Sequence, residues 1–193
     1  MLTHTELAHA AKRAYDDCNL RVGWDMEANV ELIEGHVCIA VRGSELDPRD
    51  WLRNFSAFPW RFKGLKQSAP FGFGRGARRV LDGFAHEVGA MVGQMPIYVT
   101  GHSLGGAVAI LLGQMMKYYQ YDVQEVVAFA APRTGKRDMV VSTTIYDHYN
   151  DPVCDVPWFW NHPVERIVLP DVSDGILQHS MDYYVKALEY RDG

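Results

Sequence analysis

The 193-residue chain is long enough to bury a core, and 48% hydrophobic and 22% charged residues are typical of a globular domain. A formal net charge of -5 argues against nucleic acid as the main partner. Three widely spaced cysteines, Cys18, Cys38 and Cys154, form no C-x-x-C motif, which argues against zinc or redox motifs and favours free thiols in a reducing compartment.

The first residues lack the basic start and apolar run of a signal peptide. No apolar stretch approaches the roughly 18 residues of a membrane span. We therefore expect one soluble domain over residues 1–193 in the cytoplasm, noting that a chain whose leader has been removed would look the same. The oligomeric state is left open.

The N-terminal part predicts a helix and then a β-hairpin. Thr3 and Glu6 have the spacing of a capping box, and residues 4–17 carry apolar side chains at helical period. Residues 30–33 and 37–41 predict two strands joined by a tight Glu-Gly turn. The second strand is apolar throughout, as expected of a strand buried on both faces of a sheet.

Gly43-Ser44 follows this strand and has two interpretations. A small polar residue after a glycine at the end of a central strand could place a backbone N–H and a hydroxyl at a site. The same residues also suit an ordinary turn that ends the strand.

The stretch from Phe55 to Phe73 is rich in aromatic residues, and glycines and prolines interrupt any period. It predicts a loop or flap. One interpretation is a satellite hydrophobic cluster under a long loop, and the other, which we favour slightly, is an apolar wall for an acyl chain or a surface that meets lipid. The candidate substrate-binding residues are Phe55, Phe58, Trp60 and His102.

Strands and helices alternate in the rest of the chain. The predicted elements are a helix over residues 80–92, a strand ending at residue 100, a helix to about residue 119, a strand at 125–130, a short helix from residue 136 to about 143, strands at 145–149 and 166–169, and a last helix opening at 178–179. This alternation predicts an α/β fold with a mostly parallel sheet.

The segment that organises the chain is Gly101-His102-Ser103-Leu104-Gly105, which fits G-x-S-x-G. It lies between a predicted strand and a predicted helix, the context of a nucleophile elbow. Its glycines suit a strained turn, and the N–H groups that open the helix would face a developing oxyanion. Ser103 is therefore the candidate nucleophile.

A serine nucleophile needs a base, and the base needs an orienting acid. In α/β hydrolases the chain order is Ser, Asp or Glu, then His. Asp151 directly follows a predicted strand and is the favoured acid, with Asp155 as the alternative. His179 follows the last strand and is the favoured base. The less well placed candidates are Asp147, Asp171, Asp174, His148 and His162.

Several stretches resemble the class 3 lipases, the fungal-lipase-like branch of the α/β hydrolases. They are, in order, Val41-Arg42-Gly43-Ser44, Asp50-Trp51-Leu52-Arg53-Asn54, Gly101 to Ala107, Ala130 to Gly135, Asn150-Asp151-Pro152-Val153 with Val156-Pro157, and His179 to Tyr184. The resemblance implies an α/β-hydrolase fold in a compact version. It also implies nucleophile Ser103, acid Asp151 and base His179, with oxyanion donors from Ser44 and from the backbone N–H of Leu104.

The chain departs from the family pattern in three places. Where the family often has a His-x-Gly-Phe stretch before its long helix, this chain has Pro70-Phe71-Gly72-Phe73. Extra residues lie between Asp151 and Val156-Pro157, which keeps Asp155 as an alternative acid. The stretch from Asp151 to His179 is short, which predicts a shallow acyl cleft and argues against long-chain triglyceride as the substrate.

The sequence is compatible with three functions. The leading one is a serine carboxylic-ester hydrolase, a lipase or esterase that needs no metal or organic cofactor. It would act on a small-molecule or lipid ester, with transient contact with a lipid interface. The alternatives are a non-catalytic lipid- or protein-binding module on a hydrolase scaffold and an acyltransferase.

Overall fold

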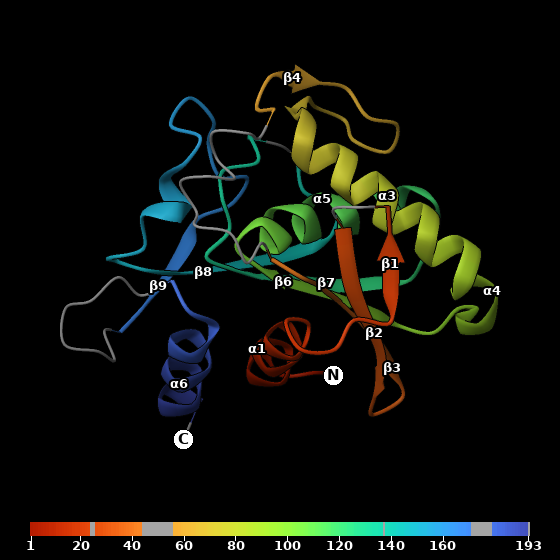
Figure 1. The fold of residues 1–193 in the computed structure, drawn as a ribbon, viewed down its shortest axis with the longest axis horizontal. Coiled ribbons are helices and arrows are strands. Elements are labelled where there is room, and N and C mark those ends of the chain that lie inside the picture. The colour runs from red at the N-terminus through yellow and green to blue at the C-terminus, as the bar shows by residue number, and fades with distance from the viewer. Residues whose placement is uncertain (24–25, 44–55, 137, 171–178, 193) are drawn as a thin grey trace.

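The computed structural model describes residues 1–23, 26–43, 56–136, 138–170 and 179–192 (Figure 1). Within them, seven strands form the main sheet in the order β1-β2-β3-β6-β7-β8-β9. The strands are Leu20–Val22 (β1), Met26–Ile33 (β2), His36–Val41 (β3), Ile97–His102 (β6), Val123–Phe129 (β7), Ser142–His148 (β8) and Arg166–Leu169 (β9). Strands β1 to β3 pair antiparallel and the rest pair parallel, so the predicted mostly parallel sheet is confirmed.

Helices cover both faces of the sheet. They are His4–Arg13 (α1), Phe71–Glu87 (α3), Gly89–Val92 (α4), Leu104–Tyr118 (α5) and Met181–Asp192 (α6). Figure 1 shows α3 and α5 on one face and α1 and α6 on the other, and a separate buried hydrophobic cluster fills each side. In the described part of the chain, every helix is too short or too polar to cross a lipid bilayer.

The burial of the central strands accounts for their largely apolar sequences. All six residues of β6 are buried, and so are Val37 to Val41 of β3, because each strand has a parallel neighbour and helices on both faces. The capping box of α1 is also present, with Glu6 and Thr3 bonded reciprocally. The predicted hairpin joins β2 to β3.

Two predictions of local structure were wrong. Phe71 and Phe73 belong to α3 and not to a loop, because the glycines of this segment permit close packing: a Cβ on Gly74 would lie 2.1 Å from the ring of Phe62. The predicted short helix at 136–143 is not present among the described residues there, since β8 already begins at Ser142.

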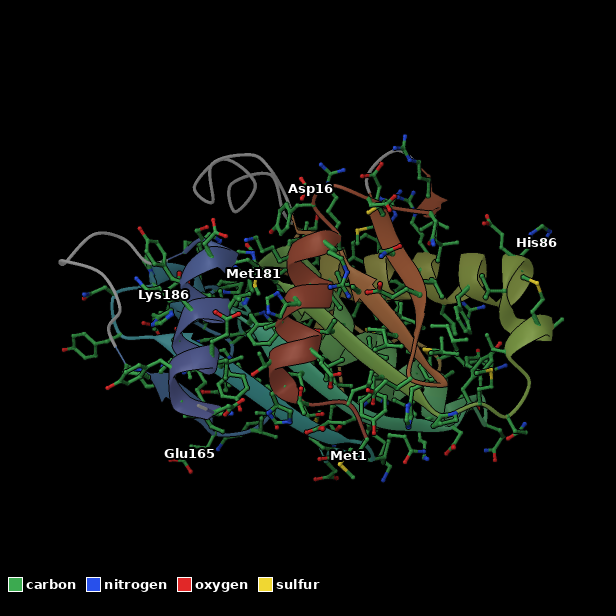
Figure 2. All side chains as sticks on the ribbon, turned by 90° about the horizontal axis from the view of Figure 1, so that it is seen from below. Met1, Asp16, His86, Glu165, Met181 and Lys186 are labelled. Atoms are coloured by element: carbon green, nitrogen blue, oxygen red, sulfur yellow. The ribbon has the colours of Figure 1, made fainter. Side chains whose placement is uncertain are left out.

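The helices α1 and α6 lie side by side and run antiparallel. Lys12 Nζ lies 2.5 Å from a carboxylate oxygen of Asp182, and the Thr5 hydroxyl donates to Asp192 at 2.6 Å. In Figure 2, Asp16 and Met181 mark the ends of α1 and α6 that lie at the same end of the layer. Tyr15 and His179 therefore approach the site from neighbouring helix ends.

Two further elements frame the C-terminal edge of the sheet. A short two-stranded sheet pairs Pro59–Trp60 (β4) with Ala69–Pro70 (β5), directly before α3. A 3₁₀ turn at Pro152–Asp155 (η1) follows β8. The indole N–H of Trp160, beyond η1, donates to the carbonyl of Ala57 at 2.9 Å, which ties these two regions together.

Candidate active site

Ser103 lies on the turn between β6 and α5 with φ 56° and ψ -126°, a conformation that L-residues rarely adopt. Close backbone approaches explain the glycines around it. A Cβ on Gly101 would lie 2.5 Å from the carbonyl oxygen of Gly105, and a Cβ on Gly105 would lie 2.2 Å from that of Val41. The chain can form this turn only because these positions lack side chains.

Ser103 and Asp151 lie on opposite sides of the imidazole of His179. Nε2 of His179 is 2.9 Å from Oγ of Ser103, and Nδ1 is 3.0 and 2.9 Å from the two carboxylate oxygens of Asp151. A carboxylate only accepts, so Nδ1 carries the proton and Nε2 accepts from the serine hydroxyl. This tautomer is the one that can remove the hydroxyl proton from a nucleophile.

Asp151 is held by two further donors. The backbone N–H of Val153 donates to Oδ1 at 3.0 Å, and the buried hydroxyl of Tyr184 donates to Oδ2 at 2.9 Å. The residue is 3% exposed, so these bonds replace the water that an ionised carboxylate requires. The result is a carboxylate fixed in position beside the imidazole.

Asp155 pairs with two arginines. Its carboxylate accepts from Arg133 at 2.7 Å and lies 3.5 Å from the Arg166 guanidinium, with a side chain 58% exposed. The two remaining histidine candidates are engaged elsewhere. His162 is bonded to the carbonyl of Cys154 at 2.7 Å, and the ring of His148 packs 4.4 Å from that of Tyr184. Asp151 and His179 are thus the pair that the fold brings to Ser103.

A second buried carboxylate lies behind Asp151. Asp147 accepts from Arg166 at 2.5 Å, and burial raises its pKa to about 6, while Cys154 and Arg166 act in the opposite direction. Ligand atoms of Asp147, Asp151 and Cys154 lie within 4.8 Å of one another. Because both carboxylates already accept hydrogen bonds from protein donors, we interpret this group as a bonded cluster and not as a metal site.

The remaining candidates are distributed as follows. Leu104 is the first residue of α5, where a backbone N–H has no partner within the helix, beside Ser103.

Of the candidate substrate-binding residues, Phe58 and Trp60 are 49% and 53% exposed and contact each other and Phe71. His102, in contrast, is buried. Ser44 and Phe55 lie outside the described residues.

Three contributors to the site had no sequence motif. Tyr184 occupies an apolar-period position of α6, and only its hydroxyl distinguishes it from a core residue. Asp147 lies within β8, and Tyr15 follows α1 at a distance of 87 residues from its partner His102. Tyr15 and Tyr184 act through contacts between segments that are far apart in the sequence.

Comparison with models of known families identifies the family of this chain. The model of the family described as "Lipase (class 3)" matches residues 38–159, more than half of the chain. The chain belongs to the class 3 lipase family. The matched region of this lipase-family chain includes the elbow serine and Asp151.

Individual relatives agree with the family. The secreted mono- and diacylglycerol lipase A of Penicillium cyclopium is 33% identical over 132 residues, which cover 63% of this chain and 43% of that protein. The match thus spans less than half the length of this curated relative.

Solved structures show the same fold. The LIP2 lipase of Yarrowia lipolytica matches with a TM-score of 0.72 at 16% identity, covering 92% of this chain and 81% of that one. A triacylglycerol lipase whose catalytic centre is described as a serine protease triad matches with a TM-score of 0.69 at 20% identity, covering 86% and 78%. The expected α/β-hydrolase fold is therefore confirmed.

The expectation of a cytoplasmic protein is wrong. The curated relatives from Penicillium cyclopium and Penicillium camembertii are both named as secreted lipases. The expectation depended on the absence of a signal-like start and on unpaired cysteines. Cys38 and Cys154 are buried, and burial raises the pKa of both thiols, so they are protected within the fold and carry no information on the compartment.

Proposed function

We propose that this chain is a serine carboxylic-ester hydrolase of the lipase and esterase class. The observation that carries the proposal is the continuous set of hydrogen bonds from Asp151 through His179 to Ser103. The triad described for the triacylglycerol lipase with the same fold supports it. A module without chemistry would have no need of this alignment.

The reaction follows from the protonation states. Ser103 Oγ attacks the ester carbonyl carbon while His179 Nε2 takes the hydroxyl proton, and Asp151 stabilises the imidazolium that forms. The imidazolium then protonates the departing alcohol, which leaves an acyl group on Ser103. Water, deprotonated by the same imidazole, releases the acid.

The negative oxygen of the tetrahedral intermediate needs donors. The backbone N–H of Leu104 opens α5, where the helix dipole favours negative charge. In sites of this type each such donor contributes roughly 3 kcal/mol to the transition state. We also propose the Ser44 N–H as a second donor, on the resemblance to the family.

Lipid-like acyl esters are the proposed substrate class. Exposed aromatic side chains lie in two segments that the Trp160–Ala57 bond connects: Phe58 and Trp60 in one, and Trp158, 80% exposed, and Phe159 in the other. Large exposed apolar groups of this kind favour contact with an acyl chain or a lipid surface.

The test uses p-nitrophenyl esters of increasing chain length and a fluorophosphonate probe. The native chain should hydrolyse short esters and be labelled. Ser103→Ala should do neither and should keep the thermal unfolding midpoint within a few degrees. Undiminished hydrolysis by Ser103→Ala would overturn the proposal.

A second assay with added alcohols distinguishes hydrolysis from acyl transfer, since new ester products would indicate that an alcohol and not water accepts the acyl group.

A further inference from the structure

Tyr15 and His102 form a partly buried contact beside the triad. The Tyr15 hydroxyl lies 2.6 Å from Nδ1 of His102, the residue directly before the nucleophile. His102 is only 3% exposed, although the sequence placed it among the residues that bind substrate. Its side chain therefore faces the protein interior.

The ring of His102 packs against the catalytic imidazole. Ring centroids of His102 and His179 are 4.7 Å apart with planes tilted by 37°, and the Tyr184 ring meets His102 edge-on at 5.8 Å. Tyr184 in turn donates to Asp151. His102 thus contacts the base directly and the acid through one intermediate.

Tyr15 has little room to move. A Cβ on Gly43, just beyond β3, would lie 2.1 Å from the Tyr15 hydroxyl and 2.7 Å from the carbonyl oxygen of His102. The absence of a side chain at Gly43 is what admits the hydroxyl. Lys12 and Asp182 pair the same end of α1 with the start of α6, and Figure 2 shows these helix ends side by side.

His102 is kept neutral. Burial lowers its pKa well below the ordinary value and the adjacent His179 lowers it further, against a smaller opposite effect of the His179 backbone. A neutral imidazole with Tyr15 donating to Nδ1 carries its proton on Nε2. Neutrality matters because His179 becomes a cation during the reaction, and a second cation at this distance would oppose it.

We propose that Tyr15 and His102 act as a positioning pair that holds the His179 imidazole in line with Ser103, and that neither contacts substrate. The proposal depends on the hydrolase function above. It extends the site to the turn that follows the N-terminal helix α1, which covers the opposite face of the sheet from α5.

The experiment is a double-mutant cycle assayed with a short soluble ester. Tyr15→Phe removes only the hydroxyl, and His102→Leu removes both hydrogen-bonding nitrogens. Each should lower kcat about tenfold with KM unchanged within about twofold, and the double variant should be no slower than the slower single variant. His102→Gln should recover most of the rate, because its amide oxygen accepts from Tyr15 and it stays neutral.

Controls separate positioning from folding. Tyr118→Phe, at an exposed position, should leave kcat, KM and the unfolding midpoint unchanged. The proposal is overturned if KM rises while kcat holds, which is the result expected of substrate contact. It is also overturned if the two single effects add in full, or if kcat falls only in proportion to the folded fraction.

A readout without substrate distinguishes this proposal from the hydrolase proposal. The Nδ1 proton that His179 shares with Asp151 gives a low-field proton NMR resonance, which should shift or broaden in Tyr15→Phe but not in Tyr118→Phe. An unchanged resonance in Tyr15→Phe would refute the positioning pair. Failure of the native chain to react with a fluorophosphonate would instead refute the hydrolase function.

Discussion

Removal of the Tyr184 hydroxyl should lower the stability of the fold by an amount that follows from its hydrogen bond to Asp151. Tyr184→Phe keeps the buried ring and removes one of the donors to the Asp151 carboxylate, leaving the His179 ring and the Val153 N–H. A hydrogen bond to a charged group contributes about 1.5–3 kcal/mol. Because the carboxylate is ionised both before and during the reaction, the lost bond weakens both states, so most of the effect should fall on stability.

The expected result is therefore asymmetric. The free energy of unfolding in urea should fall by about 1.5–3 kcal/mol, with the thermal midpoint lowered by several degrees, since about 2–4 °C per kcal/mol is typical at this size. The kcat should fall less than about tenfold, because His179 still holds the carboxylate. Tyr190→Phe, on the same helix and 79% exposed, is the matched control.

The opposite asymmetry would refute this reasoning. If Tyr184→Phe unfolds like the native chain but loses kcat by about a hundredfold or more, the hydroxyl acts on the transition state and not on the resting carboxylate. That outcome would place Tyr184 in the chemistry itself.

The remaining predictions concern three carboxylates, those of Asp151, Asp155 and Asp147. Asp151→Asn should lower kcat by several orders of magnitude because the amide favours the wrong imidazole tautomer, whereas Asp155→Asn should stay within about threefold; a larger loss in Asp155→Asn would contradict the geometry. The pKa of Asp147 is raised to about 6, above the value near 4 of an unfolded aspartate, so the native state binds more protons between these values. Stability should therefore fall as pH rises from about 4 to 6, by on the order of 2 kcal/mol relative to Asp147→Asn, in urea titrations at each pH. Parallel curves for the two proteins would show that Asp147 does not titrate in this range.

The sequence predicted the parts of this molecule that local chemistry determines. The positions of the central strands along the chain, the sharp turn at Ser103 and the choice of an aspartate after β8 as the candidate acid all follow from runs of apolar residues, glycines and the chain order Ser, Asp, His. Glycine was the least reliable guide. At Gly101 it permits the close approach that the Ser103 turn needs, whereas at Gly74 it admits Phe62 against a regular helix.

What could not be predicted depends on contacts between distant segments. Nothing within 20 residues of Tyr15 indicates that its hydroxyl reaches His102, and the helical period of α6 makes Tyr184 look like a core residue. The choice between Asp151 and Asp155 also depended on the tertiary structure, since Arg133, from another loop, donates a hydrogen bond to the Asp155 carboxylate.

The distance along the chain between the nucleophile and its base has a consequence for folding. The turn at Ser103 can form from β6 and α5 alone, but His179 is 76 residues further on and reaches Ser103 only when α6 has docked beside α1. Contacts of such long sequence separation carry a large loop-closure entropy and slow folding. A chain in which α6 has not docked would thus carry a strained serine without a proton acceptor, and the proposed esterase activity requires that docking. Regain of turnover after dilution from urea is then a more demanding measure of the native state than recovery of helix or sheet.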